Sequence, residues 1–130
     1  MESSNNLYRA IGKLFYAIAS VDNTVHFLEY KTVVRLIGQE GSSSNESKHV
    51  IIPHGSKEIL KSFYTMLQAG IPAYDAFKGF VSYKKTHEQE FTPEIKKWIW
   101  QIADSITYSF ARKNKSEVII LSKLKETLQK

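Results

Sequence analysis

The chain has 130 residues, no cysteine and a formal net charge of +5 at pH 7; 42% of its residues are hydrophobic and 24% are charged. This length suits one domain, and the composition is near the average for a globular protein, so it implies neither a disordered chain nor a membrane protein. Without cysteine there is no disulfide, no thiolate zinc site and no cysteine nucleophile.

The first two predicted helices occupy roughly residues 7–37. Apolar residues three and four positions apart predict a helix that ends near Val21, with Asn5 and Asn6 before it as caps. Turn-forming residues follow at 22–24, and a second helix is expected from about Phe27 to Ile37. The apolar positions of the first helix are Leu7, Ile11, Leu14, Phe15 and Ile18.

The helical pattern fails between residues 38 and 55. The glycine- and serine-rich run at 41–45 has no apolar residue to bury, so we expect a mobile loop. Residues 50–52 are apolar and precede Pro53, which indicates a short connector that ends at the proline.

Two helices are predicted next. Ser56 is a candidate cap for a third helix, which should end at Gly70 because glycine is common just after a helix. Pro72 suits the first turn of a fourth helix, where its missing N–H costs nothing. The inward positions are Ile59, Leu60, Phe63 and Leu67 on the third helix and Ala73, Ala76, Phe77, Phe80 and Val81 on the fourth.

A fifth helix is predicted from Thr92 and Pro93 to about Arg112, with the threonine as cap and the proline in the first helical position. Its apolar residues cover more than one face, so we expect it in the centre of the bundle. One side carries Ile95, Trp98, Ile99, Ile102, Ile106 and Phe110, and another carries Trp100, Ala103, Thr107, Tyr108 and Ala111.

The last helix is expected to begin near Asn114, where Glu117 completes a capping pair. Residues 118–121 are all apolar, and over so short a run the pattern fits a buried strand as well as a helix. The cap before them and the residues at 123–126 favour a helix. The sequence therefore predicts an all-α domain over residues 1–130, a bundle of about six helices with a mobile loop near 38–55.

Two segments resemble the TerB-like, or tellurite-resistance, helical family. Residues 14–29, LFYAIASVDNTVHFLE, are similar to its first motif, in which a helix with small residues ends at an aspartate and the next helix carries a glutamate. Residues 110–117, FARKNKSE, are similar to the last hairpin of a small stand-alone branch of Bacteroidetes type. The resemblance implies a non-catalytic helical domain whose acidic loop residues are associated with divalent-metal binding and stress response.

The first loop of the resemblance carries the candidate metal ligands, Asp22 and Glu29. Asn23 stands where the family usually has glycine, and His26 stands where it has a capping serine or threonine. A hard cation such as calcium takes six to eight oxygen ligands, and this loop offers few. The favoured interpretation is structural: Asp22 begins a turn and Glu29 stabilises a helix start by ~0.3–1 kcal/mol. We therefore expect an impaired or absent site and no cofactor, with a divalent cation as the alternative.

The second loop replaces acidic residues with basic ones. Residues 16–19 and 108–111 align as a weak internal repeat, which indicates two pseudo-repeated helix-loop-helix hairpins and places Asn114 opposite Asp22. If the loops are neighbours, as the family fold implies, a cation of the second can pair with Asp22 or Glu29, an exposed contact worth ~0–1 kcal/mol. The basic residues concerned, which are also the candidate interaction residues, are Arg112, Lys113 and Lys115.

Enzymatic activity is not expected. The chain has no Gly-x-Ser-x-Gly elbow, and its serine-rich run lacks the lysine of a phosphate-binding loop. A basic nucleic-acid-associated protein is the alternative function, since the lysine pairs at 84–85 and 96–97 and the basic loop at 112–115 have aromatic residues nearby. Tyr108 and Trp100 lie at core-like helical spacing, however, so nucleic acid is the less favoured partner.

The favoured function is a stress-associated interaction protein. The apolar run at 118–121 offers surface for an unknown protein partner or for a second copy of the chain. No apolar run approaches the ~20 residues that span a bilayer. The first six residues lack the basic and apolar regions of a signal peptide. We therefore expect a cytoplasmic protein without membrane insertion.

Overall fold

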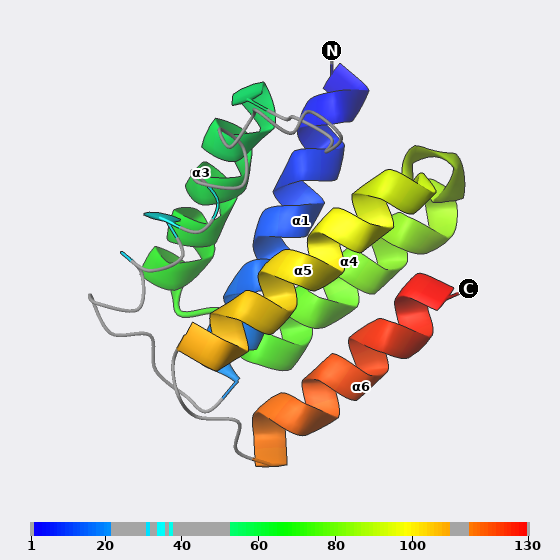
Figure 1. Ribbon diagram of the computed structural model, residues 1–130. Helices are drawn as coiled ribbons and strands as arrows, with labels where there is room; N and C mark the ends of the chain where they lie inside the picture. The colour runs from blue at the N-terminus through cyan, green and yellow to red at the C-terminus, as the bar shows by residue number, and fades with distance from the viewer. Residues whose placement is uncertain are drawn as a thin grey trace.

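The computed structural model describes residues 2–21, 31, 34, 35, 37, 53–109 and 115–129, and the regular structure in them is entirely helical (Figure 1). This confirms the all-α prediction for these residues. The predicted six-helix count and pseudo-repeat stay predictions. The elements are α1 (Glu2–Ser20), α3 (Pro53–Ala69), α4 (Ala73–Thr86), the short 3-10 helix η2 (Glu88–Glu90), α5 (Pro93–Ser109) and α6 (Lys115–Gln129).

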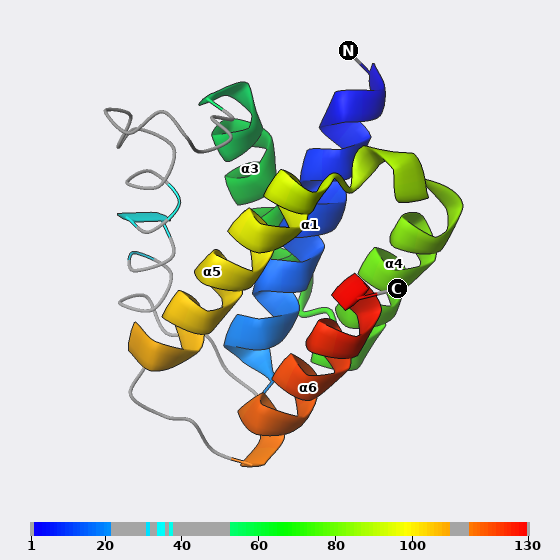
Figure 2. The same ribbon diagram turned by 45° about the vertical axis from the view of Figure 1, so that its right-hand side comes forward.

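The centre of the described bundle is α1. It packs against α3, α4, α5 and α6, and both ribbon views show it between α3 and α4, with α5 crossing it (Figure 2). The sequence pattern predicts α5 at this place. That prediction rests on the number of apolar residues in the helix and does not consider whether its side chains are small enough for several helices to pack around it. Small residues such as Ala17 and Ala19, both buried, let other helices approach α1 from several sides.

The core forms around large side chains of α1. Phe15 packs against Trp98 of α5 with ring centroids 6.0 Å apart, and Tyr16 meets the edge of Phe63 of α3 at 5.8 Å. Fully buried isoleucines extend this core along α1, α3 and α5, and their burial adds to the hydrophobic stabilisation. They are Ile11, Ile18, Ile59, Ile99, Ile102 and Ile106.

Two helices begin earlier than the sequence predicts. The first helix already includes Asn5 and Asn6, and the Asn6 side chain accepts a hydrogen bond from Arg9 within the helix. Pro53 is the first residue of α3, a position that tolerates its missing N–H, so residues 53–55 belong to this helix and not to the predicted loop. Ser56 therefore lies inside α3 and is not its cap.

The end of α3 agrees with the prediction. Gly70 has a φ of 66°, a left-handed conformation that glycine adopts without a steric penalty. The N–H of Gly70 donates to the Leu67 carbonyl and that of Ile71 to the Met66 carbonyl, both at 3.2 Å, which closes the helix end. The hydroxyl of Tyr16 donates to the Ile71 carbonyl at 2.6 Å, which ties this turn to α1.

The later helices also follow the sequence pattern. Pro72 lies just before α4, one position earlier than predicted. The Thr92 hydroxyl accepts the N–H of Ile95 at 3.2 Å, so Thr92 is the predicted cap of α5. Residues 118–121 are part of α6, so the alternative of a strand is wrong. None of the described helices is both long and apolar enough to cross a bilayer.

Candidate functional site

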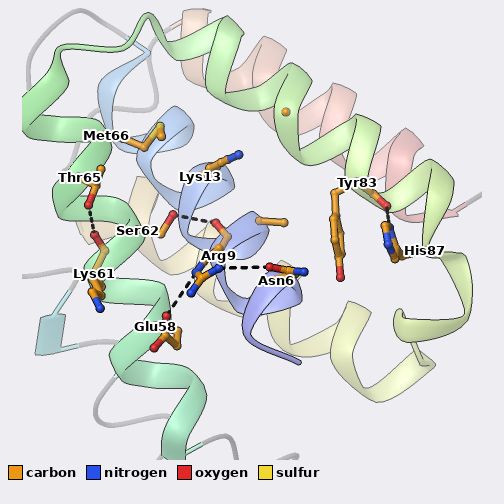
Figure 3. A pocket seen from close by; sticks show the side chains of 12 residues that line it. Asn6, Arg9, Lys13, Glu58, Lys61, Ser62, Thr65, Met66, Tyr83 and His87 are labelled. Atoms are coloured by element: carbon orange, nitrogen blue, oxygen red, sulfur yellow. Dashed lines mark hydrogen bonds and ion pairs between the residues drawn. The ribbon is translucent and has the colours of Figure 1, made fainter. Parts of the chain in front are cut away.

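A groove of about 580 Å³ lies over α1 between α3 and α4 (Figure 3). Its floor and walls come from three helices, each contributing residues three or four positions apart, which is the spacing of one helix face. We call it the α1 groove. Its lining residues are Asn6, Arg9, Ala10 and Lys13 of α1; Glu58, Lys61, Ser62, Thr65 and Met66 of α3; and Gly79 and Tyr83 of α4, with His87 just beyond that helix.

One end of the α1 groove is close to charge-neutral. The Nε atom of Arg9 lies 3.5 Å from Oε1 of Glu58, and the Arg9 guanidinium also donates to the Asn6 side chain at 3.2 Å. Oε1 of Glu58 is buried and has no hydrogen bond of good geometry, so this ion pair is its main electrostatic compensation. Arg9 and Glu58 thus offset each other at this end (Figure 3).

Lys13 and Lys61 make the rest of the α1 groove positively charged. The side chain of Lys13 runs beside Gly79 of α4: a Cβ atom at position 79 would lie 3.5 Å from Cδ of Lys13 and 3.8 Å from its Nζ. Lys61 lines the α3 side. Among the described residues, no carboxylate forms an ion pair with either lysine. The groove therefore has a surplus of positive charge once Arg9 and Glu58 have offset each other.

The α4 wall of the groove is a stacked pair of rings. Tyr83 and His87 have ring centroids 4.0 Å apart and planes 8° apart, and the His87 Nδ1 atom lies 3.0 Å from the Tyr83 carbonyl oxygen. The Tyr83 hydroxyl donates to Oε1 of Glu90 at 2.5 Å. Burial, and then this contact with the Glu90 carboxylate, raise the pKa of Tyr83 well above its usual value. Tyr83, like an ordinary tyrosine, is neutral at ordinary pH and forms an uncharged aromatic wall of the groove.

The serine and threonine hydroxyls that line the groove donate to backbone carbonyls. Ser62 donates to the Arg9 carbonyl at 2.8 Å, and Thr65 donates to the Lys61 carbonyl at 2.9 Å. A serine nucleophile needs a neighbouring base to accept its proton, and here the proton is directed at an amide carbonyl. In this arrangement neither Ser62 nor Thr65 donates its proton to a side-chain base.

A second surface feature is the outer side of α6. Val118 and Ile119 are 48% and 44% exposed, although Ile120 and Leu121, which follow them, are buried. Exposed Lys123 and Lys125 and the acidic Glu126 share the shallow hollow beside them. We call this the α6 face; it combines apolar and mainly basic side chains.

The residues predicted as sites from the sequence lie outside the side chains that the structure describes. This holds for Asp22 and Glu29, the metal candidates, and for Arg112 and Lys113; Lys115 is the first residue of α6, but its side chain is outside too. The predicted ion pair between the two loops stays a prediction. Within the described part, no three His, Asp or Glu side chains gather in a way that could hold a metal.

One lysine of the predicted basic and aromatic surface lies in the core. This residue, Lys84, is buried, and its ammonium lies 3.0 Å from Oε1 of Glu88. Tyr83 is directed to Glu90, and Trp100 is partly buried against the core. Lys84 is therefore not available to a nucleic-acid phosphate.

Sequence reasoning missed the α1 groove. Arg9 and Lys13 belong to no motif, and nothing in one segment of the sequence reveals that two other helices form walls beside them. The helical Gly79 was the one local signal, since glycine weakens a helix and here leaves the space beside Lys13 open.

Comparisons with protein-family models, curated proteins and solved structures found no match to this chain.

Proposed function

We propose that this chain is a non-enzymatic interaction protein that binds an acidic protein partner through the α6 face. The observation that carries the proposal is the exposure of Val118 and Ile119 on a helix whose other apolar residues are buried. Adjacent apolar side chains with a polar rim are typical of interaction surfaces.

The charge of the surrounding chain selects the partner. From position 112 onward there are six basic residues and two acidic ones, and Lys123 and Lys125 are exposed beside the apolar pair. Opposite charges guide association and exclude like-charged partners, so the partner should present apolar side chains within an acidic surface. The candidate interaction residues Arg112, Lys113 and Lys115 directly precede or begin α6 and add to this positive charge.

Affinity purification from the native cells tests the proposal with two variants. Val118→Glu/Ile119→Glu adds negative charge to the α6 face, whereas Tyr74→Glu changes an exposed aromatic residue on α4 and is the matched control. We expect an acidic protein that wild type and Tyr74→Glu retain, that the double variant loses, and whose retention weakens with salt. Retention that the double variant does not change would contradict the proposal.

Light scattering separates this reading from self-association. The wild-type chain should be monomeric at high concentration. A dimer that Val118→Glu/Ile119→Glu dissociates would instead assign the α6 face to a second copy of the chain.

We further propose that the chain is TerB-like and stress-associated, with an impaired or absent metal site at Asp22 and Glu29. Support comes from the sequence resemblance and from the small number of oxygen ligands that the first loop offers. Calorimetric titration with calcium, magnesium and zinc should show no saturable micromolar binding. Such binding, if Asp22→Ala abolished it, would overturn this part of the proposal, and unchanged tellurite tolerance of a deletion strain would remove the stress association.

A further inference from the structure

We propose that the α1 groove binds a small amphipathic anion, with one carboxylate, phosphate or similar group beside Lys13 and an apolar body against Ala10, Met66 and Tyr83. This site is distinct from the α6 face and does not depend on the function proposed for it. The inference rests on the charge, the lining and the shape of the groove.

The charge places the anionic group near Lys13. Arg9 is already offset by Glu58 at 3.5 Å, so an anion next to that pair would meet a carboxylate as well as a guanidinium. Lys13 has no such carboxylate among the described residues, and Lys61 adds a second positive charge to the lining. An ammonium partly removed from water binds an oxyanion more strongly than an exposed one does, because the local dielectric constant is lower.

The lining and size suit an apolar body of moderate dimensions. Ligand sites of about 300–1,000 Å³ are typically lined by apolar side chains with a few polar groups that fix orientation, and the groove of about 580 Å³ fits that range. Ala10, Met66 and the ring of Tyr83 supply apolar contact surface. Tyrosine is neutral at ordinary pH, and burial and Glu90 raise the pKa of Tyr83 further, so this residue adds no negative charge that would repel the ligand.

Gly79 keeps the groove open on the α4 side. A methyl group at this position would make ordinary contact with Lys13, whereas a longer side chain would project toward the space that the lysine occupies. Since the groove opens to solvent, such a side chain can be accommodated without disturbing the buried core. Position 79 therefore allows the groove to be filled without removing any charged residue, although a longer side chain also shifts Lys13.

Matched fluorescent probes test the site. Anilinonaphthalene sulfonate carries an aromatic body and an anionic group, and N-phenylnaphthylamine carries the same body without the sulfonate. Both are titrated into the folded full chain, with circular dichroism confirming that each variant is native. We expect the sulfonate to bind saturably at one site and about tenfold more tightly than the neutral probe, a difference that one charge-assisted contact accounts for.

Three variants locate the bound probe. Lys13→Gln should weaken sulfonate binding about tenfold and leave the neutral probe unchanged. Gly79→Leu should weaken both probes, because it fills the groove. Lys78→Gln removes the same charge from an exposed position next to Gly79 that does not line the groove, and it should leave both affinities unchanged.

Competition then identifies the headgroup. Octanoate and octyl phosphate should displace the sulfonate, and the stronger of the two distinguishes a carboxylate ligand from a phosphate ligand. Inorganic phosphate alone should not displace it, since it lacks the apolar body. Equal affinity for the charged and neutral probes, an equal effect of Lys13→Gln and Lys78→Gln, or no binding to the native chain would each overturn the proposal.

Discussion

The buried ammonium of Lys84 lies 3.0 Å from Oε1 of Glu88 and 5.7 Å from the ring centre of Phe91. The lysine side chain is 2% exposed and the glutamate side chain 49% exposed, so the pair joins the core to the surface. It links the last turn of α4 to η2 and to the residue that follows η2. Lys84 thus holds the connection between α4 and α5, a structural role that replaces the nucleic-acid contact suggested by its place in a lysine pair.

Loss of Glu88 should destabilise the protein more than loss of Lys84. Glu88→Ala leaves an ammonium among apolar groups and should lower the free energy of unfolding by about 1–1.5 kcal/mol. Lys84→Met removes the buried charge together with its need for a partner and keeps most of the packing, so its cost should be smaller. Urea unfolding followed by tryptophan fluorescence measures both, with exposed Gln89→Ala as the control. A larger loss for Lys84→Met would contradict this account.

Two helical glycines should respond to alanine in opposite directions. A Cβ atom on Gly12 would lie 2.5 Å from the Ile59 carbonyl oxygen and 2.7 Å from Cβ of Ser62, so Gly12→Ala must push α1 and α3 apart. We expect a loss of about 1–3 kcal/mol. Gly79→Ala meets only Lys13 at ordinary contact distance and should stabilise α4 by about 0.5–1 kcal/mol. If thermal unfolding shows that both variants change the stability in the same direction, the close contact between α1 and α3 at Gly12 does not explain the difference between the two glycines.

Local signals in the sequence were sufficient for much of the fold. Gly70 and Thr92 act through the conformation of one residue or a bond to a near neighbour, and each marks the predicted helix boundary. Asn6 has the side chain of a good cap, yet it lies inside α1, because a propensity does not say which of several polar residues the helix will use. Boundaries were therefore predictable where backbone geometry restricts the choice.

Arrangement in space was less accessible to sequence reasoning. The central position of α1 depends on small residues such as Gly12, which let neighbouring helices approach closely. Such residues do not produce an apolar repeat that the sequence analysis could detect. The α1 groove forms where three helices meet, so Lys13 and Tyr83, which are far apart in the sequence, line the same cavity only in the folded protein. The exposed Val118 and Ile119 lie in the apolar run for which the sequence predicted unburied surface, and here the pattern was informative.

Substitution of Gly70 should destabilise the turn between α3 and α4. The residue has a φ of 66°, and no other group lies within 4 Å of the place that an added methyl group would take, so backbone strain is the only penalty for Gly70→Ala. We expect a loss of about 1–2 kcal/mol, and a smaller loss for Gly70→Asn, because asparagine adopts this conformation more readily. Chemical denaturation of the two variants measures the difference. Equal stability of Gly70→Ala and wild type would show that the turn can adopt another conformation.

Tyr83 should make the stability of the protein decrease at alkaline pH. Burial and the Glu90 carboxylate raise its pKa above the ordinary value of 10.0, so the folded state holds this proton more tightly than the unfolded state does. The resulting stability is fully present below pH 10 and is lost as the pH rises above it, because the unfolded chain then releases the proton first. Tyr83→Phe loses the hydrogen bond to Glu90 and should be less stable at neutral pH, yet it should lose less stability than wild type above pH 10. Glu90→Gln should lower the pKa of Tyr83 and leave that of Tyr8, which burial alone raises, unchanged. Tyrosinate absorbance and urea unfolding across this range measure both effects, and an alkaline loss that Tyr83→Phe does not reduce would assign it to other groups.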